Sequence, residues 1–503
     1  MKANQISAPW GLMSGSTARP QGDRQGMRPK DAPQTPSHEG LFAHLDLAFK
    51  RWLGWHKTFA HGVYPVEHKE LTAGKPIRRL PFADELIIPL QQHKGAPAVP
   101  IVKVGQEVMR GEPIARANEV MSVPLHAPAT GVIRAIGLAP TADGPKAPAI
   151  FLKVYQAASQ DALLGKRCDP EQLSPEEIIQ AVQEAGLVGL GGAAFPSYVK
   201  LRPQAGRSIH TLLVNGCECE PYLTCDHRIM LEQAESLIRG IRIALKAAGA
   251  RRAIIGVEDN KLDAIAHLRA HLRQTDPDGP ISVAAVQAKY PQGAEKMLIK
   301  ALLDQEVPIG GIPADLGVAV FNVGTLAQMG ELLPKGQGLI ERVITVSGPA
   351  VKHPGNFLVP IGTPVRFLLE RIGITGDLGE VILGGPMMGM AVASLDVPIT
   401  KGVSGVVALH PEDPALAARP VYPCIHCGEC VRACPVSLNP SLLGELAMAR
   451  QYQAMAEQYL EQCFECGCCA FVCPANIPLT QYFRIAKSIN RDAERRRAGK
   501  GSH

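Results

Sequence analysis

The sequence has no apolar run long enough to cross a membrane. A membrane-spanning helix needs about 18 or more consecutive apolar residues, and the nearest candidate, Val381–Leu395, is interrupted by Gly384-Gly385-Pro386. The first ten residues have neither the basic start nor the apolar centre of a secretory signal. We therefore expect a chain of the cytoplasm that does not itself span a membrane.

Aromatic residues and net charge are scarce as well. Phe, Trp and Tyr make up 5% of the chain, and 52 Lys and Arg residues stand against 47 Asp and Glu residues, which gives a net charge of +5. The segment from Arg484 to the end accounts for this excess, with seven basic residues against Asp492 and Glu494. Because the chain has no other basic patch, we expect no nucleic-acid partner and interpret residues 483–503 as a solvated or membrane-facing basic tail.

The apolar content excludes a disordered chain. The 503 residues are 46% hydrophobic and 20% charged, as in globular proteins with full cores, and at about 150 residues per domain they suggest about three or four domains. Residues 1–40 are rich in Pro, Gly, Ser and Gln without an apolar period, so we expect a flexible N-terminus. The pattern of residues 41–60 predicts a short helix, either a surface helix or, given its tryptophans and basic residues, a partner-docking one.

Short β segments separated by turns are predicted over residues 61–160. The stretches Val104–Ala115 and Ala127–Ile133 resemble the sandwich fold of biotinyl and lipoyl carrier domains. The expected hairpin tip, Asn118–Ser122, has no lysine to carry a covalent cofactor. We therefore expect a structural or docking barrel-sandwich domain rather than a swinging arm.

Strand and helix patterns alternate over residues 170–335. A capping box predicts a helix that begins at Ser174, because Pro175 follows it and Glu177 can reach back to it. Further strands are expected at 211–215, 253–257 and 281–286, with helices at 227–245 and from 262. This βαβαβ order predicts a largely parallel sheet with ligands at the carboxyl ends of its strands. Residues 336–410 then return to short strands.

Eight of the thirteen cysteines form two groups with the same spacing, Cys-x2-Cys-x2-Cys-x3-Cys-Pro, over residues 415–482. Three thiolates on a tight loop hold three corners of a 4Fe–4S cluster, and the fourth, before the proline, ligates the other cluster. One cluster is therefore expected on Cys424, Cys427, Cys430 and Cys473. The second is expected on Cys434, Cys463, Cys466 and Cys469.

Other interpretations of these cysteines are weaker. Structural zinc sites use two separated pairs of ligands, and an odd number of cysteines without an export signal argues against disulfides. Cys468 is surplus to both groups. Crossed ligation brings two clusters close together, so we expect a conductor of single electrons that needs a donor and an acceptor.

A glycine-rich segment, Gly186–Pro196, precedes Lys200. It fits a relaxed dinucleotide pattern, but it follows a helix, whereas a Rossmann loop follows a strand. It is therefore either a phosphate-cradling loop, which the lysine favours, or a tight structural turn. The strand that ends at Asn215 leads into Glu218 and Glu220, whose carboxylates either bind ribityl or ribose hydroxyls or are solvated.

Three motifs, Gly189–Lys200, Asn215–Pro221 and Asn322–Leu326, resemble the flavin-binding subunit of respiratory NADH dehydrogenases. The resemblance implies that flavin mononucleotide (FMN) contacts Gly189, Gly191, Gly192, Lys200, Asn215, Glu218, Asn322 and Thr325. It implies that the nicotinamide nucleotide contacts Phe195, Glu220, Tyr290 and Glu295, with no catalytic acid or base. The chain departs from that family at Cys217, Ala294 and Gly324, and in carrying two clusters rather than one.

The order of domains resembles the RnfC family, the C subunits of the Rnf (Rsx) ion-translocating electron transport complexes, over about residues 60–480. The resemblance implies a multidomain α/β chain: barrel sandwich, FMN/NAD-binding domain, β-grasp (SLBB-like) domain over 336–410 and helical two-cluster ferredoxin-like domain. It implies a peripheral enzyme subunit on the cytoplasmic face of the bacterial inner membrane. That subunit exchanges electrons between NAD(H), FMN and two 4Fe–4S clusters, and its partners are other subunits, including an iron–sulfur subunit, and indirectly ferredoxin.

Two other functions remain open from the sequence. The departures from the flavin-binding pattern allow a flavin-free iron–sulfur adaptor that transfers electrons between other subunits. The third candidate is the flavin subunit of a soluble hydrogenase or formate dehydrogenase, which would purify with a large catalytic partner. Flavin content separates the first two.

Overall fold

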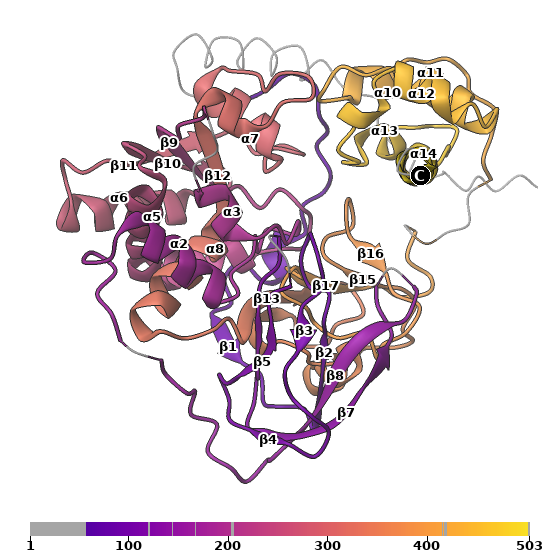
Figure 1. The fold of residues 1–503 in the computed structure, drawn as a ribbon. Coiled ribbons are helices and arrows are strands. Elements are labelled where there is room, and N and C mark those ends of the chain that lie inside the picture. The colour runs from indigo at the N-terminus through magenta and orange to yellow at the C-terminus, as the bar shows by residue number, and fades with distance from the viewer. Residues whose placement is uncertain are drawn as a thin grey trace, which may run out of the picture. The chain divides into compact units, whose positions relative to one another are not determined.

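The computed structural model describes residues 57–500 except 119–120, 143, 166, 203–205, 415 and 417–419 (Figure 1). The chain divides into two units, Met1–Leu53 and Gly54–His503, and every described residue belongs to the second. The predicted flexible segment 1–40 and residues 41–56 of the predicted helix therefore lie outside the described residues. Residues 57–60 of that expected helix are not helical, since Lys57 forms a β-bridge with Val286.

Two small antiparallel sheets, β2-β8-β7-β4 and β3-β5-β6, form the barrel sandwich. Their strands are β2 (Glu85–Pro89), β3 (Val99–Pro100), β4 (Glu107–Val108), β5 (Pro113–Arg116), β6 (Leu125–His126), β7 (Gly131–Ala139) and β8 (Ala147–Val154). Aliphatic side chains from both sheets, such as Leu86, Ile114 and Ile150, are fully buried in a shared core. Within the expected hairpin tip, Glu119 and Val120 lie outside the described residues.

The segment before the sandwich pairs with other parts of the chain. Val63 bridges to Tyr290, the short 3-10 helix η1 (Lys69–Leu71) follows, and β1 (Ile77–Arg79) pairs in parallel with β14 of the third domain. The first strand of the two sandwich sheets is therefore β2.

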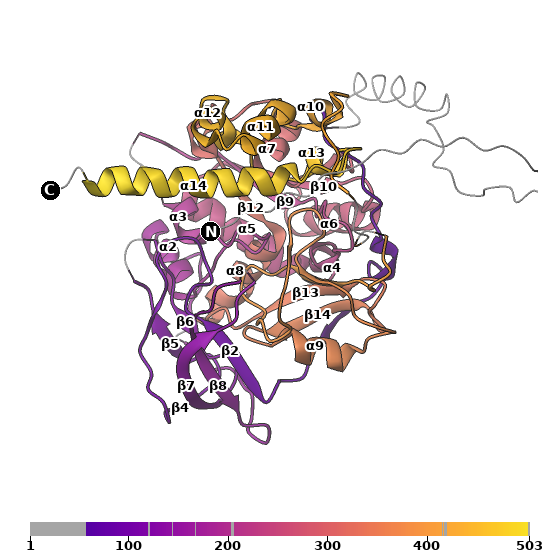
Figure 2. The same ribbon diagram turned by 90° about the vertical axis from the view of Figure 1, so that its right-hand side faces the viewer.

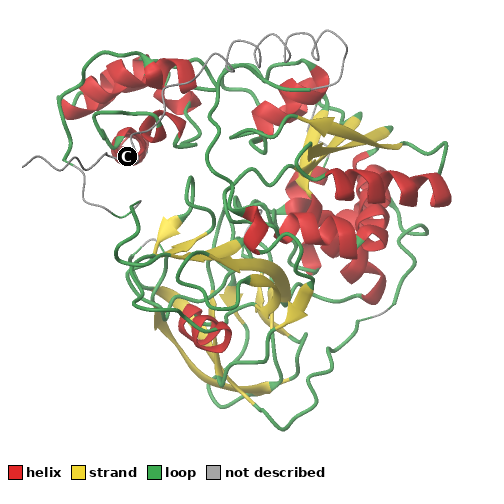
Figure 3. Ribbon diagram, turned by 180° about the vertical axis from the view of Figure 1, so that it is seen from behind, coloured by secondary structure: helices red, strands yellow, loops and turns green. Residues whose placement is uncertain are grey.

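A parallel sheet with the order β11-β10-β9-β12 lies between helices (Figure 3). One face packs against α5, α6 and α8, and the other packs against α7. The strands are β9 (Thr211–Gly216), β10 (Arg252–Glu258), β11 (Ile281–Val286) and β12 (Val318–Asn322). The α-helices are α2 (Pro175–Glu184), α3 (Ser197–Leu201), α4 (Cys225–Glu232), α5 (Ala234–Ala248), α6 (Leu262–Thr275), α7 (Glu295–Leu303) and α8 (Val323–Leu332), with 3-10 turns η2 (Pro313–Leu316) and η3 (Leu333–Lys335).

The predicted parallel βαβαβ pattern is confirmed, as is the capping box at Ser174 and Glu177. The expected helix 227–245 is instead two helices, because the chain leaves the helical conformation at Gln233. Strands β9, β10 and β11 follow one another across the sheet, whereas β12 returns to the other side of β9. This topology puts a switch point between β9 and β12, where α/β sheets bind ligands.

The third domain is a mixed sheet with the order β1-β14-β13-β17-β15-β16. Its remaining elements are β13 (Glu341–Ser347), β14 (Gly355–Pro360), α9 (Val365–Ile372), β15 (Val381–Leu383), β16 (Met390–Ala391) and β17 (Gly405–Ala408). The strands predicted around Val346 and Phe357 are both present as β13 and β14. Helix α9 has its apolar face in the core of this sheet.

Several short helices and one long helix form the C-terminal domain (Figure 2). They are α10 (Glu429–Ala433), α11 (Pro440–Met448), α12 (Tyr452–Glu457), η4 (Leu460–Gln462), α13 (Cys468–Phe471) and α14 (Leu479–Lys500). Residues 483–500 of the predicted basic tail belong to α14, so they continue the helix that packs in the core of this domain. Among the described residues, no helix is both long and apolar enough to span a bilayer.

Two glycines let α5 and α8 touch backbone to backbone. A Cβ atom on Gly240 would lie 1.8 Å from the carbonyl oxygen of Leu326, and one on Gly330 would lie 2.0 Å from that of Ser236. We expect Gly240→Ala to lower the unfolding free energy by about 1–3 kcal/mol, since overpacking forces the helices apart. Calorimetric unfolding measures this, with Gly74→Ala as control, because no atom lies within 4 Å of its Cβ position. Equal melting temperatures for the two variants would contradict the close contact.

Candidate functional site

Two asparagines end the strands on either side of the switch point. Asn215 of β9 and Asn322 of β12 are register partners. The Asn322 side chain caps α8, where its Oδ1 accepts hydrogen bonds from the N–H groups of Gly324 at 2.9 Å and Thr325 at 3.3 Å. Asn215 accepts a hydrogen bond from the N–H of Cys217 and donates one to a carbonyl oxygen in the loop before α7. The carboxyl edge of the sheet and the N-terminus of α8 therefore meet at one place.

The glycine loop is fastened to this place. The N–H of Leu190 donates to the Thr325 hydroxyl at 2.9 Å, and the loop closes on itself through a 2.8 Å bond from the N–H of Gly189 to the Phe195 carbonyl. Gly191 is exposed, and a Cβ atom on it would lie 3.3 Å from the Asn322 side chain. An exposed glycine backbone beside a helix N-terminus suits a phosphate group.

Lys200 supplies a cation next to this loop. Its ammonium lies 2.6 Å from Glu295 Oε2 and donates to the Val320 carbonyl at 3.0 Å. Both side chains of the ion pair are about one-third exposed, at 31% for Lys200 and 37% for Glu295. A phosphate at the loop would therefore have to compete with Glu295 for Lys200.

The two predicted carboxylates are engaged by backbone N–H groups. Glu218 caps α4 by accepting hydrogen bonds from Asp226 at 2.8 Å and His227 at 3.0 Å. Glu220 accepts from the N–H groups of Met387 and Met388 of the third domain, at 3.0 and 2.8 Å. Burial raises the pKa of Glu220 to about 7, against the lowering effect of these two bonds. Contacts of either carboxylate with FMN or nucleotide stay predictions.

Buried lysines that the sequence analysis did not single out hold this acidic loop. The Lys69 ammonium donates to the carbonyl oxygens of Glu218, Glu220 and Leu223 at 2.8, 2.9 and 2.7 Å. The Lys261 ammonium donates to the Cys217 carbonyl at 2.6 Å and to the Glu258 carboxylate at 2.7 Å. The sequence does not point to either lysine. The loop that they hold is distant from both in sequence, and it is held through backbone carbonyl oxygens, which any residue type supplies.

Tyr290 contacts the iron–sulfur domain. Its ring is 1% exposed, and its hydroxyl donates to the carbonyl oxygen of Cys466 at 2.7 Å. Its backbone pairs with Val63 on both sides, at 2.8 and 2.9 Å. Among the predicted nucleotide residues, Phe195 and Glu295 thus lie with the glycine loop, whereas Glu220 and Tyr290 contact the two domains that follow.

The eight grouped thiols line two cavities in the C-terminal domain. One is lined by Cys424, Cys427, Cys430 and Cys473. The other is lined by Cys434, Cys463, Cys466 and Cys469, and also by Cys468, which belongs to neither group. Each cavity joins three thiols of one group with the fourth thiol of the other, which is the arrangement a pair of 4Fe–4S clusters requires.

The two groups also repeat in backbone conformation. Every cysteine of the second group lies 39 positions after its counterpart, as Cys463 does after Cys424. Three matched pairs share the left-handed region: His426 and Glu465 (φ 52° and 61°), Gly428 and Gly467 (75° and 85°), and Ser437 and Asn476 (55° and 53°). This duplication of dihedral angles makes two equivalent cages from one local fold.

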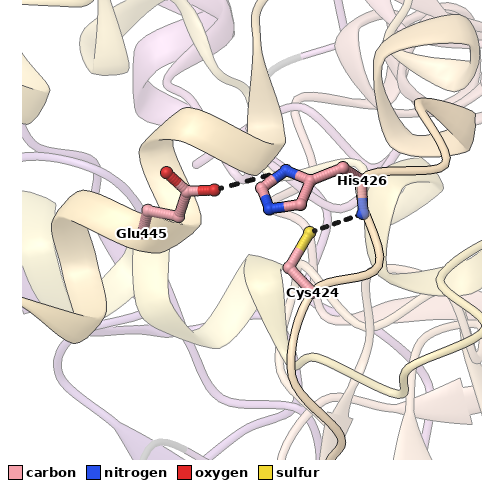
Figure 4. A group of neighbouring side chains, drawn as sticks. All are labelled: Cys424, His426 and Glu445. Atoms are coloured by element: carbon pink, nitrogen blue, oxygen red, sulfur yellow. Dashed lines mark hydrogen bonds and ion pairs between the residues drawn. The ribbon is translucent and has the colours of Figure 1, made fainter.

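Polar groups around the cavities fit thiolate-held clusters. The N–H of His426 lies 3.4 Å from the Cys424 sulfur, and the N–H of Glu465 lies 3.4 Å from the Cys463 sulfur. Figure 4 shows the first contact, with the His426 Nδ1 atom 3.7 Å from Glu445 Oε1. In the second cavity the buried Thr480 side chain hydrogen-bonds Cys469. Such donors stabilise the negative charge of cluster sulfurs.

Four family models match the chain in the order that the fold suggests. They are the RnfC barrel sandwich hybrid domain over residues 57–156, the Nuo51 FMN-binding domain over 182–331, the SLBB domain over 343–391 and a 4Fe-4S dicluster domain over 423–478. The fold and the sites thus define an electron-transfer protein with a flavin domain and two iron–sulfur clusters.

Curated relatives narrow the class. The chain is 40% identical over 76% of its length to the C subunit of the proton-translocating ferredoxin:NAD(+) oxidoreductase complex of Clostridium ljungdahlii, of which 83% is covered. It is also 40% identical, over 76% of its length, to the C subunit of the Na(+)-translocating complex of Acetobacterium woodii, of which 86% is covered. It is 42% identical, over 85% of its length, to the C subunit of the ion-translocating oxidoreductase complex of Rhodobacter capsulatus, of which 82% is covered. The chain belongs to this family, the C subunits of ion-translocating ferredoxin:NAD oxidoreductase complexes.

A solved NAD+-reducing [NiFe]-hydrogenase, in its air-oxidized state, is a more distant likeness. Its TM-score is 0.46 at 23% identity, and the match covers 58% of this chain and 55% of that one. This likeness is too low to carry an argument.

We expect Lys200→Ala to weaken FMN binding by about tenfold or more, because a hydrogen bond to a charged group contributes about 1.5–3 kcal/mol. Equilibrium dialysis of the purified protein against FMN measures the affinity, and iron content should stay unchanged. The exposed Lys103 provides the control variant, Lys103→Ala. Unchanged flavin affinity in Lys200→Ala would count against the loop assignment.

We expect Cys434→Ala to damage the cluster of the second group, although Cys434 lies in the first group by sequence. Iron analysis and electron paramagnetic resonance (EPR) of the reconstituted protein should show one cluster intact, on Cys424, Cys427, Cys430 and Cys473. Cys468→Ala should retain both clusters. Loss of only the Cys424 cluster in Cys434→Ala would refute the crossed ligation.

Proposed function

We propose that this chain is the NAD(H)-reacting subunit of a membrane-bound, ion-translocating ferredoxin:NAD oxidoreductase. The observation that carries the proposal is the 2.7 Å hydrogen bond from Tyr290 to the Cys466 carbonyl, which joins the flavin domain to an iron–sulfur site. A flavin domain in contact with two cluster sites can transfer electrons between pyridine nucleotides and one-electron carriers. The family membership of the chain supports the same function.

The residues of the flavin site would position FMN and shield it from water, and none of them would act as an acid or base. FMN, when bound, supplies the exchange between the two-electron chemistry of NAD(H) and the one-electron chemistry of the clusters. Gly191, Gly192 and the α8 N-terminus at Thr325 would hold its phosphate, with Lys200 as counter-ion. Asn215 and Asn322 would hold its polar groups at the switch point. Glu295 is freed for nucleotide contact when Lys200 turns to phosphate.

The two cluster sites differ in their surroundings, which suggests their order. Cys434, Cys466 and Cys469 of the second site are buried, and this site touches Tyr290. In the first site Cys427 is exposed, and its neighbour Ile425 is 65% exposed. We therefore assign the second site to the flavin side and the first to the side of an iron–sulfur partner subunit. In this proposal ferredoxin exchanges electrons through that partner, and we assign this subunit to the cytoplasmic face of the bacterial inner membrane.

One observation favours a second function, that of a flavin-free adaptor. Lys200 already has a counter-ion in Glu295, and Glu218 and Glu220 are already hydrogen-bonded. A domain with its binding groups satisfied internally can persist as a scaffold without flavin. The clusters would then pass electrons between two other subunits.

We expect an anaerobic NADH titration of the reconstituted protein to bleach both flavin and iron–sulfur absorbance. NADH reaches the clusters only through a bound flavin, so the two signals should fall together. Reconstitution without FMN is the control and should leave the iron–sulfur bands unchanged. If the wild-type protein binds no FMN and its clusters do not respond to NADH, the adaptor function is the correct one.

A further inference from the structure

The 39-residue repeat of the iron–sulfur domain extends beyond the cysteines into the helices that follow them. Helix α11 after the first group matches the first turns of α14 after the second. Residues that line one cavity therefore have counterparts at the other. Five matched pairs differ in a charge-bearing residue: His426 and Glu465, Glu429 and Cys468, Arg432 and Phe471, Glu445 and Arg484, and Met448 and Lys487.

The second site has a buried cation. Lys487 is 8% exposed, its ammonium donates to the Cys463 carbonyl, and it lies 3.4 Å from Glu465 Oε1. Arg484 also pairs with Glu465, at 3.2 Å, but its side chain is more exposed. Two cations thus surround one carboxylate, and the cation closer to the thiol loop is the one shielded from water.

The first site has the opposite balance at the matched positions. Met448 is exposed and uncharged, and Glu445 lies beside the exposed imidazole of His426. Arg432 and Glu429 also lie near this site, but they form an exposed ion pair whose charges cancel. The buried positive charge at the second site therefore has no counterpart at Met448.

From this asymmetry we infer that Lys487 raises the reduction potential of the cluster held by Cys434, Cys463, Cys466 and Cys469. The inference rests on the proposed function for the presence of that cluster. A reduced cluster carries one more negative charge, so a nearby cation stabilises the reduced state more than the oxidised state. Burial keeps this attraction from being screened. Solvent exposure of the first site affects the other potential separately, so the inference concerns the contribution of Lys487 alone.

The raised potential has a role in the proposed path. The second site is the one that contacts the flavin domain through Tyr290. A cluster with a less negative potential at that position accepts electrons from the flavin side more readily. Lys487 acts through its charge alone. It contacts the Cys463 carbonyl and is not itself a ligand of the cluster.

The test is a potentiometric titration of the reconstituted protein, followed by EPR. We expect Lys487→Met, which copies Met448, to shift the midpoint potential of one cluster to a more negative value and to leave the other near its original value. Lys487→Arg keeps the charge and should restore the wild-type potential. Full iron content in Lys487→Met with both potentials unchanged would overturn the inference, and so would an equal shift of both clusters.

Two further variants keep the test decisive if Lys487→Met loses its cluster. Glu465→Gln removes the anion beside Lys487 and should shift the same cluster to a less negative potential. Met448→Lys should shift the other cluster in that direction. Because loss of the Glu465 carboxylate raises the potential whatever Lys487 does, the deciding variant is Met448→Lys. An unchanged potential there would show that a cation at this matched position does not act on its cluster, and that result would sink the inference. If the wild-type clusters show normal potentiometric titrations but are not reduced by NADH, the proposed NAD(H) function is wrong, and the inference about Lys487 is unaffected.

Discussion

Three buried lysine ammonium groups hold the loops of the flavin domain against segments from elsewhere in the chain. A buried charge costs several kcal/mol unless hydrogen bonds replace its hydration, so each ammonium fixes the carbonyl oxygens that surround it. Lys69 and Lys261 hold the acidic loop. Lys401 donates to the carbonyls of Gly186 and Pro124, at 2.7 and 3.2 Å, and burial lowers its pKa to about 7. The flavin-binding edge therefore depends on the segments that deliver these lysines.

This dependence explains why the chain interleaves its domains. Lys69 comes from the segment before the sandwich, and Lys401 comes from the third domain. The β1 strand of that same early segment completes the third sheet. Each domain thus contributes a group that another domain needs, and the fixed loops in turn present Asn215, Asn322 and the glycine backbone at the switch point.

Features set by nearby residues were predictable from the sequence. The cysteine spacing, the capping box at Ser174 and the parallel sheet all follow from patterns within one or two elements. Each cavity is lined by the four thiols that the spacing groups together, and the second cavity is lined by Cys468 as well. The break at Gln233 was not predictable, because the apolar pattern of the helix continues through it.

Features set by long-range contacts were not predictable. The bond from Tyr290 to Cys466 joins positions 176 residues apart, and that from Lys69 to Glu218 joins positions 149 residues apart. Sequence reasoning assigned Tyr290 to a nucleotide pocket, and the structure shows its hydroxyl at an iron–sulfur loop. It also treated Lys200 and Glu295 as ligands of different groups, whereas their side chains form an ion pair with each other. A single sequence does not indicate which distant residues will contact each other.

The crossed thiol sets have a consequence for how the domain is made. During synthesis, the first group leaves the ribosome with only three of the thiols that line its own cavity, since the fourth is Cys473. The second cavity needs Cys434 and is complete once Cys469 has been added. The two sets therefore become complete within a few residues of each other, at Cys469 and Cys473. Delivery of iron to either cavity therefore waits until most of the second cysteine group has been synthesised, and a product that ends before Cys469 completes neither thiol set.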